Sequence, residues 1–169
     1  MIWGYTPNGV FSTRTAYEVL TMRETDHNRL VWKAIWRAPV AQRVRHFLWL
    51  VKRDRLFTNM ERVRRHMAED AACVFCGQLE STVHVLGDCV KACKVWLRLV
   101  PRSCKLRFFS QDVNEWMWTN VVEYFVVGLE NWGTTFPIVC WRLWAWRNMT
   151  IFLNKIVLLR RSWRIFKVE

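Results

Sequence analysis

Three cysteines and one histidine lie close together near the middle of the chain, with the spacing Cys73-x2-Cys76-x7-His84-x4-Cys89. A Cys-x2-Cys pair places two thiolates on one tight turn, and Gly77 directly after it frees the backbone to make that turn. Three sulfurs and one nitrogen suit zinc, which accepts thiolate ligands and asks only for four-coordination. The spacing therefore predicts one Zn2+ ion. Because four protein ligands leave no position for an activated water, the metal is expected to be structural.

Spacing alone leaves the fourth ligand open, because Cys93 could replace Cys89 and His66 is a further candidate. The alternative for His84 is an ordinary helical histidine, and for Cys89 it is a buried thiol. A Cys-x2-Cys pair on its own could also be a redox motif, but that chemistry needs a strand-to-helix context that the surrounding residues do not predict. With all four residues at ligand spacing inside one short segment, zinc is the favoured interpretation.

Patterns typical of enzymes are missing from the sequence. It holds no phosphate-binding glycine loop, no defensible Ser/His/Asp set and no histidine-pair metalloprotease motif. Polymerase and nuclease sites hold magnesium with clustered carboxylates, whereas the aspartates here are isolated except for Asp70, which follows Glu69. The chain is therefore predicted not to be an enzyme.

Positive charge is in excess and unevenly placed. The chain has 26 Lys and Arg against 14 Asp and Glu, a net charge of +12. Eleven basic residues lie between Arg29 and Arg65, six lie between Lys91 and Arg107 where there is no acid, and a third basic run covers 155–167. A single run is best interpreted as a solvated helix face, but three runs together favour a polyanionic partner, of which nucleic acid is the commonest.

The composition predicts a soluble chain with a hydrophobic core. Apolar residues make up 52% of it, and no apolar run reaches the roughly 18 residues that span a bilayer. Arg142, Arg147 and Lys155 interrupt the most apolar segment. The N-terminal residues lack the basic and apolar regions of a secretion signal. We therefore expect an intracellular protein, in the nucleus or cytoplasm, without a membrane partner. In such a reducing compartment the six cysteines are metal ligands or free thiols.

Apolar residues recur at helical spacing along most of the chain, so the predicted fold is mainly α-helical, a small module held together by one structural zinc ion. The clearest apolar stripe lies within 41–53, and Thr58 and Glu61 have the capping-box spacing that begins the next helix. The predicted helices are 12–20, one from about residue 30 to Pro39, 41–53, 59–67, 92–100, 113–129 and 136–159, and the C-terminal ones are rich in tryptophan. Only a small hairpin is expected near the metal.

Several segments in a fixed order resemble one known family. Trp3 with GVFSTRTAY (9–17) is similar to its opening motif, and VWKAIWRAPVAQRVRHFLWLVKRDRLFTN (31–59) is similar to its Trp-x-x-Ile/Leu-Trp stretch and basic helix. CVFCGQLESTVHVLGDC (73–89) resembles its cysteine–histidine box, and WRLWAWRNMTIF (141–152) resembles a later tryptophan-rich segment. Over most of its length the chain therefore resembles the reverse-transcriptase zinc-binding domain of plant non-LTR retrotransposons.

The resemblance implies a ligand set and a place in a larger protein. The family's fourth ligand falls four residues after the histidine, which selects Cys89 over Cys93. The resemblance also implies a zinc-binding domain over 3–100 and a helical linker or tail over 101–169 that leads to a ribonuclease-H-like domain. A reverse transcriptase would lie upstream in the same polyprotein.

The favoured function is a non-catalytic accessory module that binds nucleic acid, RNA or DNA, through a basic helical face. The predicted phosphate contacts are Arg43, Arg45, Lys52, Arg53, Arg62, Arg64 and Arg65. His46 and Trp49 are candidate stacking partners, although core packing is the preferred interpretation for Trp49. One alternative is a structural spacer between polymerase and ribonuclease H domains, and another is an inert fragment of a retroelement gene.

Overall fold

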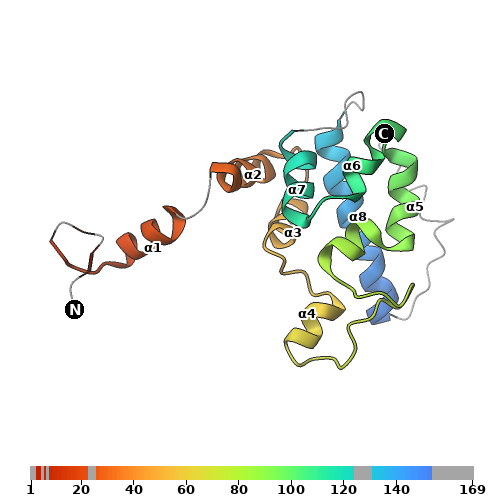
Figure 1. Cartoon of the computed structure of the whole chain (residues 1–169), viewed down its shortest axis with the longest axis horizontal. Coiled ribbons are helices and arrows are strands. Elements are labelled where there is room, and N and C mark those ends of the chain that lie inside the picture. The colour runs from red at the N-terminus through yellow and green to blue at the C-terminus, as the bar shows by residue number, and fades with distance from the viewer. Residues whose placement is uncertain (1–2, 5, 7, 23–25, 124–130, 154–169) are drawn as a thin grey trace.

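The computed structural model describes residues 3–4, 6, 8–22, 26–123 and 131–153, and these residues are mainly helical (Figure 1). The helices are α1 (Thr13–Met22), α2 (Asp26–Arg37), α3 (Gln42–Lys52), α4 (Asn59–Arg64), α5 (Val90–Leu99), α6 (Lys105–Phe109), α7 (Val113–Val121) and α8 (Trp132–Leu153). A π-helical turn, η1 (His84–Asp88), precedes α5, and a 3-10 turn, η2 (Arg102–Cys104), precedes α6. Within the described ranges, extended pairing is limited to one antiparallel bridge between Ala72 and Leu79. The prediction of a mainly α-helical fold is confirmed.

Helix α3 lies within the predicted range 41–53, and α4 begins at the predicted residue 59 but ends at Arg64 instead of 67. The Thr58 hydroxyl caps α4 by accepting a hydrogen bond from the Glu61 backbone N–H at 3.3 Å. The Glu61 carboxylate does not bind the cap in return, because it pairs with Arg64 and Arg65 one turn further on. Only the hydroxyl half of the predicted capping box therefore forms.

Some boundaries differ from the prediction. α7 ends at Val121, and residues 124–130 of its predicted range lie outside the described part of the chain. α8 begins at Trp132 rather than at 136, because Trp132 and Phe136 are both buried in one aromatic core. The predicted end of that helix, 154–159, also lies outside the described residues. α6 was not predicted, since a five-residue helix is too short to show a period.

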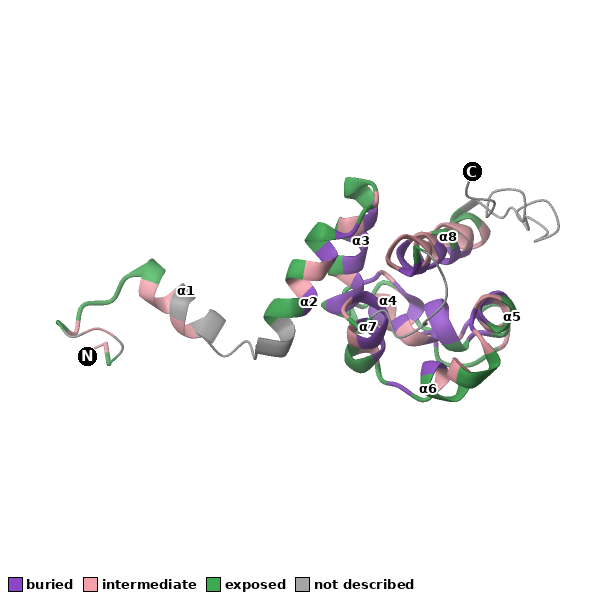
Figure 2. Ribbon diagram, turned by 90° about the horizontal axis from the view of Figure 1, so that it is seen from above, coloured by how far each residue is buried: buried purple, intermediate pink, exposed green. Residues whose placement is uncertain are grey.

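Helix α8 is central to the packing. It contacts α3, α7 and η1, while α2 packs on both α3 and α7, and α5 packs on η1. In the view of Figure 1, α5 lies on one side of α8 and α3 lies on the other. α1 lies apart from these helices in both ribbon views, and Figure 2 shows that the buried positions of the other helices face one another.

Large aromatic rings fill the core between α5, α6, α7 and α8. Trp96 is fully buried there, and its indole N–H donates a hydrogen bond to the Leu86 carbonyl oxygen at 2.6 Å. Four rings have their centroids between 5.0 and 6.1 Å from that of Trp96, and they belong to Phe108, Trp116, Trp132 and Phe136. One core therefore contains residues from both sides of the predicted domain boundary at residue 100.

Two tryptophans of the basic region lie at the surface. Trp36 is 39% exposed and Trp49 is 38% exposed. The core packing expected for Trp49 is therefore wrong, because α3 buries a different face, which carries Phe47, Leu48 and Val51.

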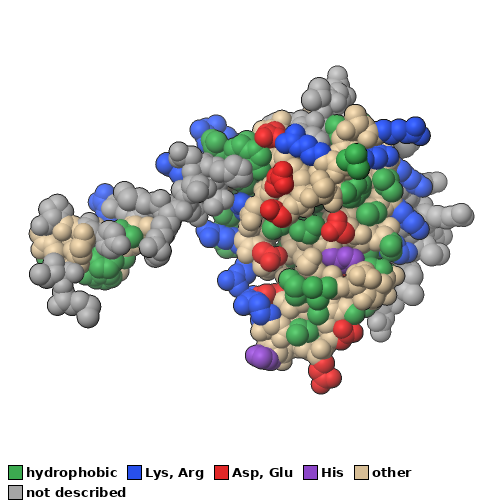
Figure 3. All heavy atoms as spheres, viewed as in Figure 1, with side chains coloured by type: hydrophobic (Ala, Val, Ile, Leu, Met, Phe, Trp, Pro, Cys, Tyr) green, Lys and Arg blue, Asp and Glu red, His purple; other side chains and the backbone are tan. Residues whose placement is uncertain are grey.

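On the face drawn in Figure 3, basic and acidic side chains are unevenly distributed. In the view of Figure 3, Lys and Arg side chains lie mainly along the two sides of the molecule, and several Asp and Glu side chains lie across the middle. Among the described helices, none combines the length and the apolar character that crossing a membrane requires.

Replacing Trp96 by alanine should strongly destabilise the fold. Truncating a buried tryptophan removes its contacts and leaves a cavity, which costs about 3–5 kcal/mol of unfolding free energy. Trp96→Phe should cost less, because it keeps a ring and loses the hydrogen bond to Leu86. Denaturant unfolding of the zinc-loaded chain measures these differences. Leu106→Ala is the control, because that side chain is 88% exposed, and it should change stability by less than about 0.5 kcal/mol. Equal losses for the two alanine variants would contradict this assignment of the core.

Candidate metal centre

The first two cysteines lie on a tight turn between the paired residues Ala72 and Leu79. The Cys73 carbonyl oxygen accepts a hydrogen bond from the Gly77 N–H at 2.8 Å, and the Cys73 N–H donates to the Gln78 carbonyl oxygen at 2.7 Å. Gly77 has a φ of +72°, a left-handed conformation that a residue without a Cβ adopts readily. We call residues 72–79 the knuckle, and its turn places both thiols on one side.

The other two side chains come from the segment that enters α5. Ser81 accepts a hydrogen bond from the His84 N–H at 3.1 Å, which fixes the start of the turn. The His84 carbonyl oxygen then accepts from the Cys89 N–H at 2.8 Å, a five-residue separation that closes one π-helical turn. Cys89 stands directly before α5. Because one wide turn separates His84 from Cys89, both side chains reach the knuckle.

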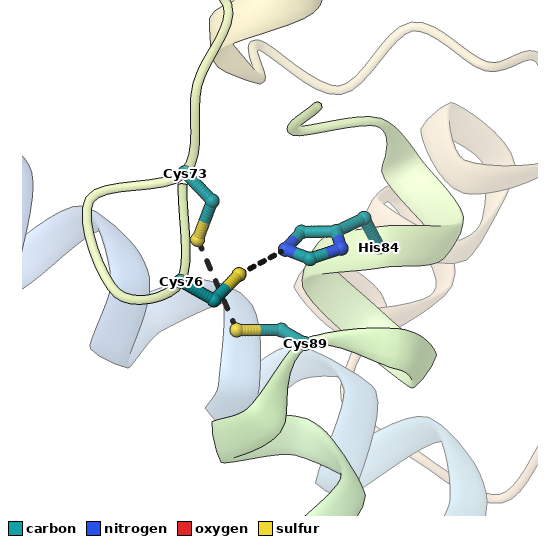
Figure 4. A group of neighbouring side chains, drawn as sticks. All are labelled: Cys73, Cys76, His84 and Cys89. Atoms are coloured by element: carbon teal, nitrogen blue, oxygen red, sulfur yellow. Dashed lines mark hydrogen bonds between the residues drawn. The ribbon is translucent and has the colours of Figure 1, made fainter. Parts of the chain in front are cut away.

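The four side chains converge on one point (Figure 4). The candidate ligand atoms of Cys73, Cys76, His84 and Cys89 all lie within 4.8 Å of one another. Cys73 Sγ lies 3.9 Å from Cys89 Sγ, and Cys76 Sγ lies 3.2 Å from His84 Nε2. Two sulfurs bound tetrahedrally at about 2.3 Å from zinc would lie about 3.8 Å apart. The donor set and its spacing therefore fit one tetrahedral zinc ion.

The two other sequence candidates lie outside this cluster. Cys93 points its thiol at the backbone instead, 3.3 Å from the Gly87 carbonyl oxygen. His66 is exposed and follows α4, and its side chain is not part of the cluster that contains Cys73.

Burial shifts the pKa of several side chains in the cluster. It raises the pKa of Cys73 to about 12, raises the pKa of Cys89 and lowers the pKa of His84. Thiols in this position keep their protons unless a cation compensates the thiolate charge, while the imidazole stays neutral, as a metal ligand must be. Zinc uptake should therefore release thiol protons, and the zinc affinity should fall as the pH falls.

A buried ion pair joins the knuckle region to α8. The Glu80 carboxylate directly after the knuckle binds the Arg147 guanidinium, and these side chains are 0% and 3% exposed. Glu80 Oε1 also accepts from the Asn59 backbone N–H at 2.8 Å, and the Arg147 guanidinium donates to Asn59 Oδ1 at 3.0 Å. Asn59 in turn donates from its side chain to the Ala72 carbonyl oxygen at 2.8 Å. The start of α4, the knuckle and α8 are thus connected through three side chains.

The sequence analysis did not identify this pair as part of the site. Arg147 was visible only as a charge that interrupts an apolar, tryptophan-rich segment, and Glu80 only as part of the cysteine–histidine box. A base in a largely apolar helix can signal buried pairing, because an unpaired charge does not stay in a hydrophobic interior. The sequence alone does not distinguish the buried Arg147 from the exposed Arg142 on the same helix.

The seven predicted phosphate contacts do not share one surface. Lys52 is only 9% exposed, and its ammonium donates to Asn114 Oδ1 at 2.6 Å. It is therefore not available to a phosphate, because α7 covers this end of α3. Arg45 donates from Nε to the Ala38 carbonyl oxygen at 3.0 Å. Arg43 is exposed near the opposite end of α3.

Arg64 and Arg65 share the carboxylate of Glu61, with N–O distances of 2.6 Å. Their hydrogen bonds, above all that of Arg64, lower the pKa of Glu61 to about 2. Glu61 is thus ionised at neutral pH, and its contribution to stability is present above the ordinary carboxyl pKa and is lost as the pH falls toward 2. The two arginine side chains remain 57% and 48% exposed, so each can still contact a further anion.

A polar groove of about 310 Å3 lies between the end of α3 and α4. Its basic lining residues are Arg53, Arg55 and Arg64, and its acids are Asp54 and Glu61. Arg55, which follows α3, was not among the predicted contacts. Arg62 lies on α4 as well and donates to Asn59 Oδ1 at 3.1 Å.

The comparisons with known proteins agree with this centre. Residues 11–96, just over half of the chain, match the family described as zinc-binding in reverse transcriptase. The chain belongs to this family. The resemblance stated from the sequence and the prediction of one zinc ion in this reverse-transcriptase zinc-binding domain are therefore confirmed.

A longer plant protein extends the similarity. The chain is 37% identical over 155 residues to an Arabidopsis thaliana protein named "putative ribonuclease H protein". The match covers 89% of this chain and 25% of that protein, so the chain spans about a quarter of its relative's length. No solved structure matches the chain.

Breaking the buried pair should destabilise the domain. Arg147→Met leaves the Glu80 carboxylate buried without its cation, which costs on the order of 3–5 kcal/mol. The double variant Glu80→Gln/Arg147→Met removes both charges and keeps an oxygen for the Asn59 N–H, so it should recover much of that loss. Denaturant unfolding of zinc-loaded protein measures both. Arg142→Met, at an exposed position on the same helix, is the matched control. A double variant no more stable than Arg147→Met would show that charge pairing is not the cause.

Proposed function

We propose that Cys73, Cys76, His84 and Cys89 are the zinc ligands and that the domain is a non-catalytic accessory module that binds nucleic acid. Four protein ligands complete a tetrahedral shell, so the metal has no open position at which to activate water or substrate. Its role is then structural: it joins the knuckle to the start of α5. In this proposal the domain works beside reverse-transcriptase and ribonuclease-H-like domains of a larger protein.

The groove between α3 and α4 is the observation that carries the nucleic-acid proposal. Three arginines line it, and the exposed Arg65 directly follows α4. A guanidinium presents a planar fork of donors that suits phosphate oxygens. Glu61 holds the Arg64 guanidinium at the groove instead of leaving a freely rotating side chain, which lowers the entropy lost on binding. In this proposal the groove replaces the broader set of contacts predicted from the sequence. Arg53, Arg64 and Arg65 are kept and Arg55 is added. The predicted residues outside this surface are Arg43, Arg45, Lys52 and Arg62.

A structural spacer is the second candidate function. The buried pair between Glu80 and Arg147 and the continuous aromatic core connect the knuckle to α8, so the described core could hold flanking domains at a fixed distance. A spacer has no need of phosphate contacts. Its nucleic-acid binding should therefore be weak and should not change when the groove arginines are neutralised.

The ligand assignment predicts opposite results for two neighbouring cysteines. Cys89→Ser should lose stoichiometric zinc, whereas Cys93→Ser should keep one zinc per chain, because only the first side chain lies in the cluster. Removing zinc should unfold at least residues 68–97, since structural zinc contributes about 10–16 kcal/mol in small zinc domains. Metal analysis and circular dichroism of the purified chain measure both effects. Full zinc stoichiometry in Cys89→Ser would mean that the fourth ligand is another residue.

Neutralising the groove should reduce the salt dependence of binding. Each phosphate contact on a single strand contributes about −0.7 to the slope of log affinity against log salt. Arg53→Gln/Arg55→Gln should therefore weaken binding to all sequences alike and flatten the slope by about 1.4. Both changes leave the Glu61 ion pairs in place. Fluorescence titration with labelled RNA and DNA at two or more salt concentrations measures the slope.

The control for that experiment changes the same net charge at another place. Arg102→Gln/Lys105→Gln alters two basic residues at η2 and the start of α6, and it should leave the slope nearly unchanged. If both double variants lower affinity equally, binding follows net charge and not the groove. If neither has an effect, the spacer function is favoured.

A further inference from the structure

Phe75, one of the two residues between the knuckle cysteines, forms an aromatic stack with α8. Phe75 and Trp146 have their ring centroids 4.9 Å apart and their planes within 9° of parallel. Both side chains are partly exposed. Because Phe75 stands between Cys73 and Cys76, any metal held by those cysteines also fixes the position of its ring. The stack is therefore a preorganised aromatic surface at the edge of the metal centre.

A lysine lies close to both rings of the stack. Lys91 Nζ is 5.7 Å from the Phe75 centroid and 5.8 Å from the Trp146 centroid. The ammonium is therefore within cation–π range of both rings. Its positive charge would lie close to a group that stacks on the partly exposed Phe75 ring.

Further basic residues extend from Lys91 along α5. Lys94 and Arg98 follow at three and seven residues, a spacing that puts them on the same helix face, and both are exposed. Arg142 is exposed one turn before Trp146 on α8. The one acid close by in sequence is Asp88, at the end of η1. This face comes from the second basic run, which the groove between α3 and α4 does not use.

We propose that Phe75, backed by Trp146, stacks on an unpaired base of single-stranded nucleic acid while Lys91 and Lys94 contact the neighbouring phosphates. The inference rests on the proposed nucleic-acid function and adds a second contact surface to it. An aromatic ring can stack on any base, but only an unpaired base offers its face, so the surface selects single strands over duplexes without reading sequence. The three-ring stack of base, Phe75 and Trp146 would gain from the rigidity of the knuckle, because little conformational entropy is lost on binding.

The test compares three ligands with the zinc-loaded full chain. The first is a labelled single strand of about 12 nucleotides, prepared as RNA and as DNA, the second is its duplex, and the third is the same DNA backbone without bases. Phe75→Ala should weaken single-strand binding by roughly 5- to 150-fold, the range measured when a stacking aromatic is truncated. It should scarcely change binding of the abasic strand. Phe75→Tyr keeps a ring and should bind like the unaltered chain.

Two controls separate stacking from folding and from net charge. Val74→Ala alters the adjacent knuckle residue, which is 61% exposed, and should leave binding unchanged. Each variant must retain one zinc per chain, and Phe75→Leu, which keeps apolar bulk without a π face, replaces Phe75→Ala if that variant loses zinc. Lys91→Gln/Lys94→Gln should weaken both the normal and the abasic strand and flatten the salt slope by about 1.4.

Failure of this inference can be told apart from failure of the proposed function. If Phe75→Ala or Phe75→Leu binds the single strand as the unaltered chain does, while Arg53→Gln/Arg55→Gln weakens it, there is no stacking surface and the groove stands. Equal losses on the normal and the abasic strand would likewise overturn stacking. If the unaltered chain binds none of the ligands, both proposals are wrong. A preference for RNA over DNA with the same response to Phe75→Ala would support the inference and identify the strand type.

Discussion

The arrangement of this domain depends on one buried charge pair, Arg147 with Glu80. A guanidinium inside a hydrophobic interior costs several kcal/mol unless an opposite charge meets it, so α8 must pack where the segment after the knuckle offers a carboxylate. Asn59 binds both members of the pair, which brings the start of α4 to the same place. Segments 67 and 88 residues apart in the chain are thereby held in one relative position.

Hydrophobic burial alone could not hold the knuckle. Its residues Val74 and Leu79 are 61% and 59% exposed, so they contribute little to the core. A metal ion held by Cys73 and Cys76 would attach one end of this segment, and the ion pair of Glu80 with Arg147 attaches the other end. Both attachments demand a specific geometry. A short segment with few buried side chains can therefore be as well positioned as the helices around it.

Local features could be predicted from the sequence, and long-range partnerships could not. The Thr58 cap and the cysteine–histidine box can be predicted from a few neighbouring residues, because a cap and a Cys-x2-Cys turn are local geometries. Lys52 shows the limit. Its position off the apolar stripe of α3 predicts a solvated side chain, but α7 covers that side and brings Asn114 to it from 62 residues away. The sequence does not identify Glu80 as the partner of Arg147 for the same reason, because the two residues are 67 positions apart in the chain.

The count of 26 basic residues overstates the number of positive side chains available to a partner. Lys52 and Arg147 are buried, and Arg64 shares a carboxylate, so the chain uses part of its positive charge to hold itself together. Part of what is left lies at the groove between α3 and α4 and on one face of α5. The knuckle is connected to both: Asn59, which begins α4, binds Glu80, and Lys91 on α5 lies beside Phe75. A structural metal that never contacts a ligand can therefore still decide whether either surface is correctly formed.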